Sequence, residues 1–103
     1  MIQDSAKIII HGDPEIADLI PGYLENRRKD IIKMRGALDR NDYETIGYLG
    51  HSMRGSGEGY GFKGISAIGL ELEQAAKTGN AEGISRRINE LEDYIGRIEI
   101  IYK

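Results

Sequence analysis

Apolar side chains recur at helical spacing near the C-terminus, and this pattern limits the folds open to the chain. The residues are Ile84, Ile88, Leu91, Ile95, Ile98 and Tyr102, separated by 4, 3, 4, 3 and 4 positions. Such spacing puts all of these side chains on one side of an α-helix. It predicts a continuous amphipathic helix over about residues 81–102, with Asn80 as its N-cap.

Three further stripes of the same kind precede this helix, over about residues 14–38, 42–57 and 63–78. Asp13-Pro14 is a typical helix start, and Pro21 lacks an N–H, so a short first helix is expected to break or kink there. The connections between stripes are short, which favours antiparallel neighbours. We therefore expect one all-α domain over residues 1–103, an up-down antiparallel four-helix bundle.

Residues 1–12 do not fit the helical pattern. Ile8, Ile9 and Ile10 could form a strand, but no other segment looks like its partner, and an isolated strand is not stable. An extended N-terminal arm lying on the bundle is the expectation. Three tyrosines, Tyr43, Tyr48 and Tyr60, are expected to be packing residues.

Composition excludes several classes of function. The 103 residues suffice for one domain, and a net charge of −3 argues against nucleic acid as a partner. No cysteine is present, and no apolar run approaches a membrane span or a signal peptide. No nucleotide-binding glycine motif occurs, and His11 and His51 lie in separate segments. We expect a cytoplasmic monomer without membrane insertion, metal or cofactor of its own.

The segment around His51 carries the residues best suited to chemistry. With Ile46 set at zero and 100° per residue, the apolar face centres near about 320° and His51 falls at about 140°. His51 should therefore be exposed. Gly47 and Gly55 occupy the positions that flank it on the helix surface, and Gly50 precedes it directly. With no side chains at positions 47 and 55, a partner could approach the ring closely.

Two polar neighbours favour phosphoryl chemistry at this ring. Arg54 follows His51 by one helical turn and brings a positive charge, and Ser56 adds a hydroxyl. A neutral imidazole is a nucleophile, and a nearby cation stabilises a phosphoryl group. The residue types suggest a phosphohistidine. The alternative is a solvated surface histidine beside chance glycines.

The local sequence resembles a known family. Residues 51–61 read HSMRGSGEGYG, which is similar to the signature H-x-[LM]-[KR]-G-S-x-x-x-x-G of histidine-containing phosphotransfer (HPt) domains. Residues 72–76 read LEQAA, which looks like the family's L-E-x-A-A stretch. The resemblance implies that His51 is phosphorylated, that Arg54, in place of the commoner Lys, steadies the phosphoryl group, and that Gly55 keeps the approach open. It further implies that Glu73 can orient the imidazole through its other nitrogen.

As a function, the resemblance implies a phosphocarrier in a two-component phosphorelay and not a self-sufficient enzyme. His51 would accept the group from a receiver-domain aspartate, or from a sensor histidine kinase, and pass it to a response-regulator aspartate. Mg²⁺ is expected on the partner receiver domain. Two alternatives stay open: a noncatalytic helical adaptor that binds receivers through the same face, and a substrate module for a kinase carried on another chain.

Overall fold

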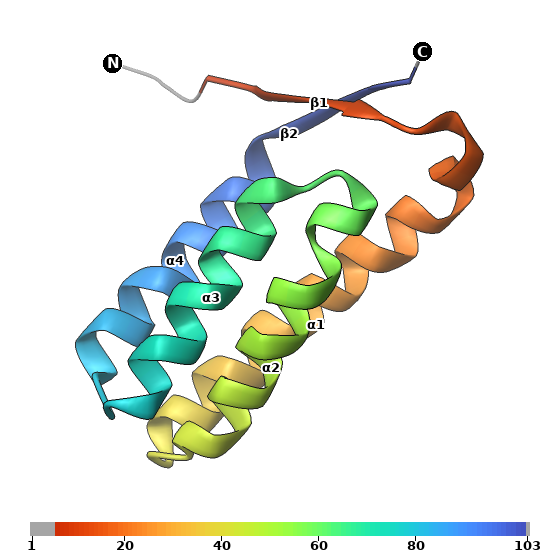
Figure 1. The fold of residues 1–103 in the computed structure, drawn as a ribbon. Helices are drawn as coiled ribbons and strands as arrows, with labels where there is room; N and C mark the ends of the chain where they lie inside the picture. The colour runs from red at the N-terminus through yellow and green to blue at the C-terminus, as the bar shows by residue number, and fades with distance from the viewer. Residues whose placement is uncertain (1–5, 103) are drawn as a thin grey trace.

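Four helices pack side by side in the computed structural model, which describes residues 6–102 (Figure 1). They are α1 (Ile20–Asp39), α2 (Tyr43–Ser56), α3 (Lys63–Lys77) and α4 (Ala81–Arg97). The expected all-α bundle is confirmed, with helices joined by short turns. Among residues 6–102, no helix is both long enough and apolar enough to cross a membrane.

The chain enters the bundle through a short 3₁₀ helix, η1 (Pro14–Leu19). Asp13 caps it, because its side chain accepts a hydrogen bond from the Glu15 N–H at 2.9 Å. Pro21 then occupies the first turn of α1, where its missing N–H costs nothing. The break expected near Pro21 is thus a change from 3₁₀ to α geometry.

A pair of strands crosses one end of the bundle, and it corrects two expectations (Figure 1). Strand β1 (Ile8–Gly12) pairs in parallel with β2 (Ile98–Tyr102), with Ile8 opposite Ile98. The predicted arm is therefore partly a strand; its residues 1–5 lie outside the described part of the chain. The last helix ends at Arg97, not at residue 102.

The physical reason for both errors is that isoleucine suits either structure. Ile98 and Tyr102 continue the helical spacing of α4, yet β-branched and aromatic residues also favour strands. Pairing with β1 lets Ile10, Ile98 and Ile100 cover the end of the core.

All four helices contribute to one core. Its fully buried side chains include Met34 of α1, Ile46 of α2, Leu72 of α3 and Leu91 of α4. The turn between α2 and α3 contains a second 3₁₀ helix, η2 (Glu58–Tyr60), and Gly61. Gly61 has φ +94°, a left-handed conformation that side chains disfavour, so this turn needs a glycine.

Helices α2 and α3 approach each other closely because two glycines face one another. A Cβ added at Gly50 would lie 2.8 Å from the backbone oxygen of Gly69 and 2.9 Å from the backbone nitrogen of Glu73. A Cβ added at Gly69 would lie 2.7 Å from the Gly50 oxygen. Any side chain at either position would push the helices apart. This contact sets the distance between His51 on α2 and Glu73 on α3.

The N-cap of α2 gives the bundle a predictable acid sensitivity. Asp42 accepts hydrogen bonds from the Thr45 hydroxyl at 2.7 Å and from the Thr45 N–H at 3.1 Å. Both bonds lower the pKa of the Asp42 carboxyl below its ordinary value, and the bond from the Thr45 hydroxyl has the larger effect. A group with a lowered pKa contributes stability above its unfolded pKa and loses it as the pH falls through the folded pKa.

We therefore expect the urea midpoint of the wild type to fall, relative to that of Asp42→Asn, as the pH drops below about 4. The Asn variant keeps a capping oxygen but cannot titrate at this position. The two midpoints should run parallel between about pH 5 and pH 7, where the wild-type carboxylate stays ionised. If the difference between the two urea midpoints stayed constant as the pH fell below about 4, the Asp42 carboxyl would not be ionised in the folded protein as we describe.

Candidate phosphohistidine site

His51 lies in the middle of α2 with 61% of its side chain exposed. Ile46 and Met53, on the same helix, are buried in the core. The helical periodicity therefore predicted the orientation of His51 correctly. Each of α1 and α3 contacts both α2 and α4, so the bundle has one face formed by α2 and α3 and an opposite face formed by α1 and α4. The His51 ring lies on the α2–α3 face.

A carboxylate on the neighbouring helix contacts the ring. Glu73 Oε2 lies 3.0 Å from His51 Nδ1. The Glu73 side chain is only 15% exposed, whereas the ring is mostly exposed. Glu73 therefore approaches the ring from the interhelical groove, and the opposite edge of the imidazole, which carries Nε2, is left for a partner.

Arg54 completes a three-residue cluster with His51 and Glu73. Its Nη2 lies 3.2 Å from His51 Nδ1, and its Nε lies 3.4 Å from Glu73 Oε1. The second contact is an ion pair without hydrogen-bond geometry: Glu73 Oε1 is buried and accepts no hydrogen bond from the described residues. The Arg54 side chain is 45% exposed, so it has room to move toward a group on the ring.

The tautomer of His51 follows from the chemistry of these neighbours. A guanidinium only donates and a carboxylate only accepts, so Nδ1 can form a hydrogen bond with Arg54 or with Glu73, but not with both. The Glu73 contact is the shorter one and is charge-assisted when the carboxylate is ionised. We assign the proton to Nδ1, which donates to Glu73 and leaves the Nε2 lone pair free.

The glycines around His51 have different roles. A Cβ at Gly55 would meet nothing within 4 Å, so this flank of the ring is open, as expected. A Cβ at Gly47 would make an ordinary 3.5 Å contact with Ala76 Cβ. Gly47 therefore borders the α2–α3 groove and does not face open solvent. Gly50 points into the helix contact with Gly69 and gives the ring no clearance.

Ser56 does not join the cluster. Its hydroxyl is hydrogen-bonded to the Tyr23 hydroxyl at 2.8 Å, which ties α2 to α1. The Tyr23 ring stacks on Tyr60 with a centroid distance of 4.1 Å. Ser56 is thus structural here, and Tyr60 is a packing residue as expected.

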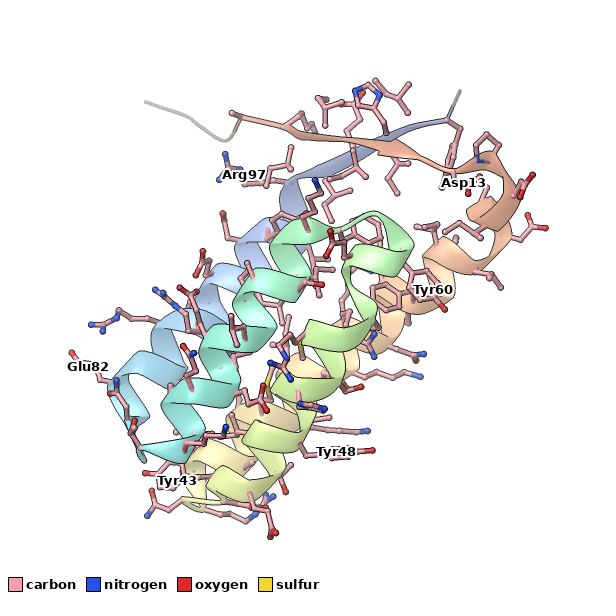
Figure 2. All side chains as sticks on the ribbon, in the orientation of Figure 1. Asp13, Tyr43, Tyr48, Tyr60, Glu82 and Arg97 are labelled. Carbon is pink, nitrogen blue, oxygen red and sulfur yellow. The ribbon has the colours of Figure 1, made fainter. Side chains whose placement is uncertain are left out.

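Tyr48 differs from its prediction. It is 72% exposed, and its side chain points away from α2 (Figure 2). Leu70 of α3 is also 37% exposed. Tyr48 precedes His51 by three positions, so the two side chains share one side of α2. The prediction that Tyr48 packs is wrong because the angular position of Tyr48 on α2 is that of the exposed face.

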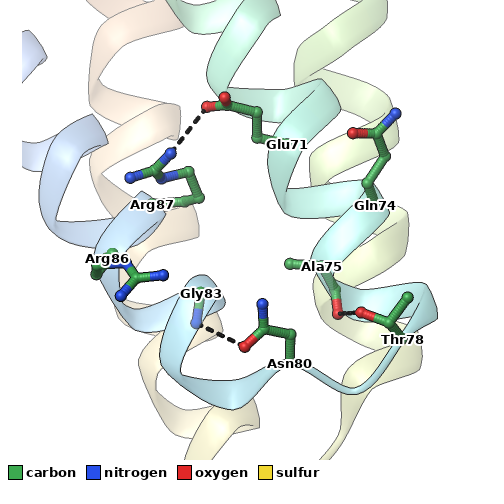
Figure 3. Close-up of a pocket in the computed structure, with 8 residues that line it drawn as sticks. All are labelled: Glu71, Gln74, Ala75, Thr78, Asn80, Gly83, Arg86 and Arg87. Atoms are coloured by element: carbon green, nitrogen blue, oxygen red, sulfur yellow. Dashed lines mark hydrogen bonds and ion pairs between the residues drawn. The ribbon is translucent and has the colours of Figure 1, made fainter.

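Two further hollows of the surface flank α3, and the smaller of them includes Glu73, which contacts the ring. A cleft of about 350 Å³ between α3 and α4 is lined by Glu71, Gln74, Ala75, Thr78, Asn80, Gly83, Arg86 and Arg87 (Figure 3). Arg87 is held by Glu71 across it at 3.3 Å. A smaller groove of about 230 Å³ between α2 and α3 includes Glu73, Gly47 and Tyr43. In residues 6–102, no group of three or more metal-binding side chains occurs.

The site thus consists of an exposed histidine on a helical bundle, with its Nδ1 3.0 Å from a carboxylate of the neighbouring helix. In a comparison with protein families, the Hpt domain model matches residues 18–100. The chain belongs to the Hpt domain family, whose members are phosphocarrier modules that function in phosphorelay signalling. Neither the search of curated proteins nor the search of solved structures found a match.

Proposed function

We propose that this chain carries a phosphoryl group on Nε2 of His51 between the aspartates of receiver domains. The observation that carries the proposal is the 3.0 Å contact between His51 Nδ1 and Glu73 Oε2. It supports a ring whose Nε2 lone pair is free and faces outward. A sensor histidine kinase is an alternative first donor in the same scheme.

The chemical step forms one bond and breaks one. The Nε2 lone pair attacks the phosphorus of an aspartyl phosphate, the N–P bond forms, and the P–O bond of the mixed anhydride breaks, so that the aspartate leaves as a carboxylate. The ring gains positive charge while Nδ1 keeps its proton. Glu73 stabilises this charge through the hydrogen bond it already accepts. Transfer to a second aspartate is the reverse sequence.

Arg54 and the open flank at Gly55 serve the incoming group. Arg54 supplies the positive charge beside the ring, at 3.2 Å from Nδ1, and its half-exposed guanidinium can reach phosphoryl oxygens. Gly55 leaves room for the receiver, and Tyr48 and Leu70 offer it apolar contacts. The Mg²⁺ that neutralises phosphoryl charge in such reactions belongs, in this proposal, to the receiver domain.

The test is transfer from receiver domains charged with labelled aspartyl phosphate. The wild-type chain should acquire a label that is lost in acid and kept in alkali, as expected of an N–P bond. Failure of labelling across several competent receivers would contradict the proposal. If the chain bound those receivers without acquiring label, the noncatalytic adaptor would be the better description.

Replacing Glu73 tests the role of the carboxylate. We expect Glu73→Ala to slow phosphoryl uptake roughly tenfold, since a hydrogen bond to a charged group stabilises by about 1.5 kcal/mol and about 1.4 kcal/mol is a factor of ten in rate. Glu73→Gln should lose less, because its amide oxygen can still accept from Nδ1–H. Imidazole nitrogen NMR should show a reduced Nδ1–H tautomer in the Ala variant. Unchanged uptake and an unchanged tautomer in Glu73→Ala would show that the carboxylate does not position the ring.

A further inference from the structure

The face formed by α1 and α4 carries an apolar groove that neither the site nor the proposed function uses. The groove has a volume of about 310 Å³ and is lined by Arg28, Ile31, Ile32, Arg35, Glu92, Ile95 and Gly96. Ile31 and Ile95 are buried and form its apolar floor. At Gly96 an added Cβ would meet nothing within 4 Å, so this side of the groove is open.

One of the residues that line the groove is an exposed apolar side chain. Ile32 is 72% exposed. Among the described residues, Ile32 and Tyr48 are equally exposed, and no other large apolar residue is more exposed. Burying an isoleucine side chain that is exposed in this way favours an association, because apolar surface is removed from water. The same face therefore carries both a projecting side chain and an apolar groove, which is the arrangement a self-complementary contact requires.

The charges along the groove differ between its two rims. Arg28 and Arg35 lie on the α1 rim, and Glu92 lies on the α4 rim. Arg35 and Glu92 form an ion pair at 2.9 Å across one end, and both side chains remain partly exposed. Helices α1 and α4 are antiparallel neighbours, so Arg28 lies toward the Gly96 end of the groove and Arg35 toward the Glu92 end.

We propose that the α1–α4 face binds a second copy of this chain, around a two-fold axis parallel to the bundle. Such an axis places α1 of each copy over α4 of the other at the same height. Ile32 then enters the opening left by Gly96 of the second copy, and the α1 rim with its arginines faces the rim that carries Glu92. A perpendicular axis in the same plane would instead bring Arg28 and Arg35 of the two copies together, which repulsion disfavours.

The available area indicates a weak dimer. Helices α1 and α4 have 20 and 17 residues, so they are about 30 and 25 Å long, and two adjacent helices are about 20 Å wide. The face thus offers roughly 500 Å² per copy, or about 1,000 Å² in total, at the lower end of specific interfaces. We expect a dissociation constant on the order of 10 µM. The α2–α3 face with His51 stays open in this dimer.

Sedimentation equilibrium of the full chain from about 1 µM to about 1 mM tests the proposal. The wild type should pass from monomer to dimer, and Ile32→Glu should weaken dimerisation at least about thirtyfold. Tyr48→Glu is the matched control, because Tyr48 is equally exposed but lies on α2, and it should dimerise like the wild type. Circular dichroism should confirm that both variants fold.

A second variant blocks the groove instead of removing the side chain that enters it. Gly96→Lys fills open space and replaces glycine by a better helix former, so folding is preserved, yet it obstructs the groove and adds charge opposite the arginines. It should also weaken dimerisation at least about thirtyfold. A wild type that stays monomeric at about 1 mM would overturn the proposal. So would a dimer that survives both Ile32→Glu and Gly96→Lys, or one that Tyr48→Glu abolishes.

Discussion

His51→Gln is expected to lower phosphoryl uptake from a charged receiver domain by at least about a thousandfold, to below detection. Glutamine can still form hydrogen bonds but has no nucleophilic ring nitrogen, so no N–P bond can form. Because His51 is 61% exposed and lies outside the core, the variant should fold and melt like the wild type. The loss should therefore be one of chemistry and not of structure.

His11→Gln provides the matched control. His11 is the only other histidine and lies on strand β1, at the end of the bundle, with an exposed side chain. Its replacement should leave uptake unchanged. Labelling of the His51→Gln protein, or loss of labelling in His11→Gln, would place the phosphoryl group elsewhere.

Gly50→Ala is expected to destabilise the bundle by about 2–3 kcal/mol, the upper part of the range for overpacking. The three atoms nearest to the new Cβ belong to groups that cannot move alone: the Gly69 oxygen at 2.8 Å, the Glu73 nitrogen at 2.9 Å and Leu72 Cβ at 3.0 Å. These close contacts can be relieved only if α2 and α3 move apart. Separation would also draw Glu73 away from His51, so phosphoryl uptake should slow even in the molecules that remain folded.

Gly55→Ala separates this effect from the general consequence of losing a glycine. Gly55 lies on the same helix, and its added Cβ would meet nothing within 4 Å. Alanine favours a helix over glycine by about 1 kcal/mol, so this variant should be slightly more stable than the wild type. Urea unfolding of the three proteins measures both changes. Equal stability of Gly50→Ala and Gly55→Ala would show that the α2–α3 contact is looser than described.

The orientation of His51 could be predicted from the sequence because it depends only on local geometry. Ile46 and Met53 fix the buried side of α2, and 100° per residue then places His51 opposite. The residue that contacts the ring could not be predicted in this way. Glu73 lies on another helix, and the periodicity of a helix does not predict which residues of two helices contact each other. The role of Glu73 was therefore predicted from the family resemblance alone.

Contacts between distant segments account for the remaining differences. Gly50 directly precedes His51 in the sequence, but its structural role depends on Gly69, which it meets only after α2 and α3 have packed. The pairing of β1 with β2 was missed because Ile98 and Tyr102 satisfy a helical pattern and a strand pattern equally well. In each case the deciding partner is far away in the sequence, where local rules give no information.

The most direct test of the central claim is the identity of the phosphorylated nitrogen. The chain, labelled with ¹⁵N in its imidazoles, would be phosphorylated by a charged receiver domain and studied by ³¹P–¹⁵N correlation NMR. The account predicts one coupling, to Nε2 of His51, with Nδ1 still protonated and bonded to Glu73. Phosphorus coupled to Nδ1 of His51, or to no nitrogen of His51, would contradict it.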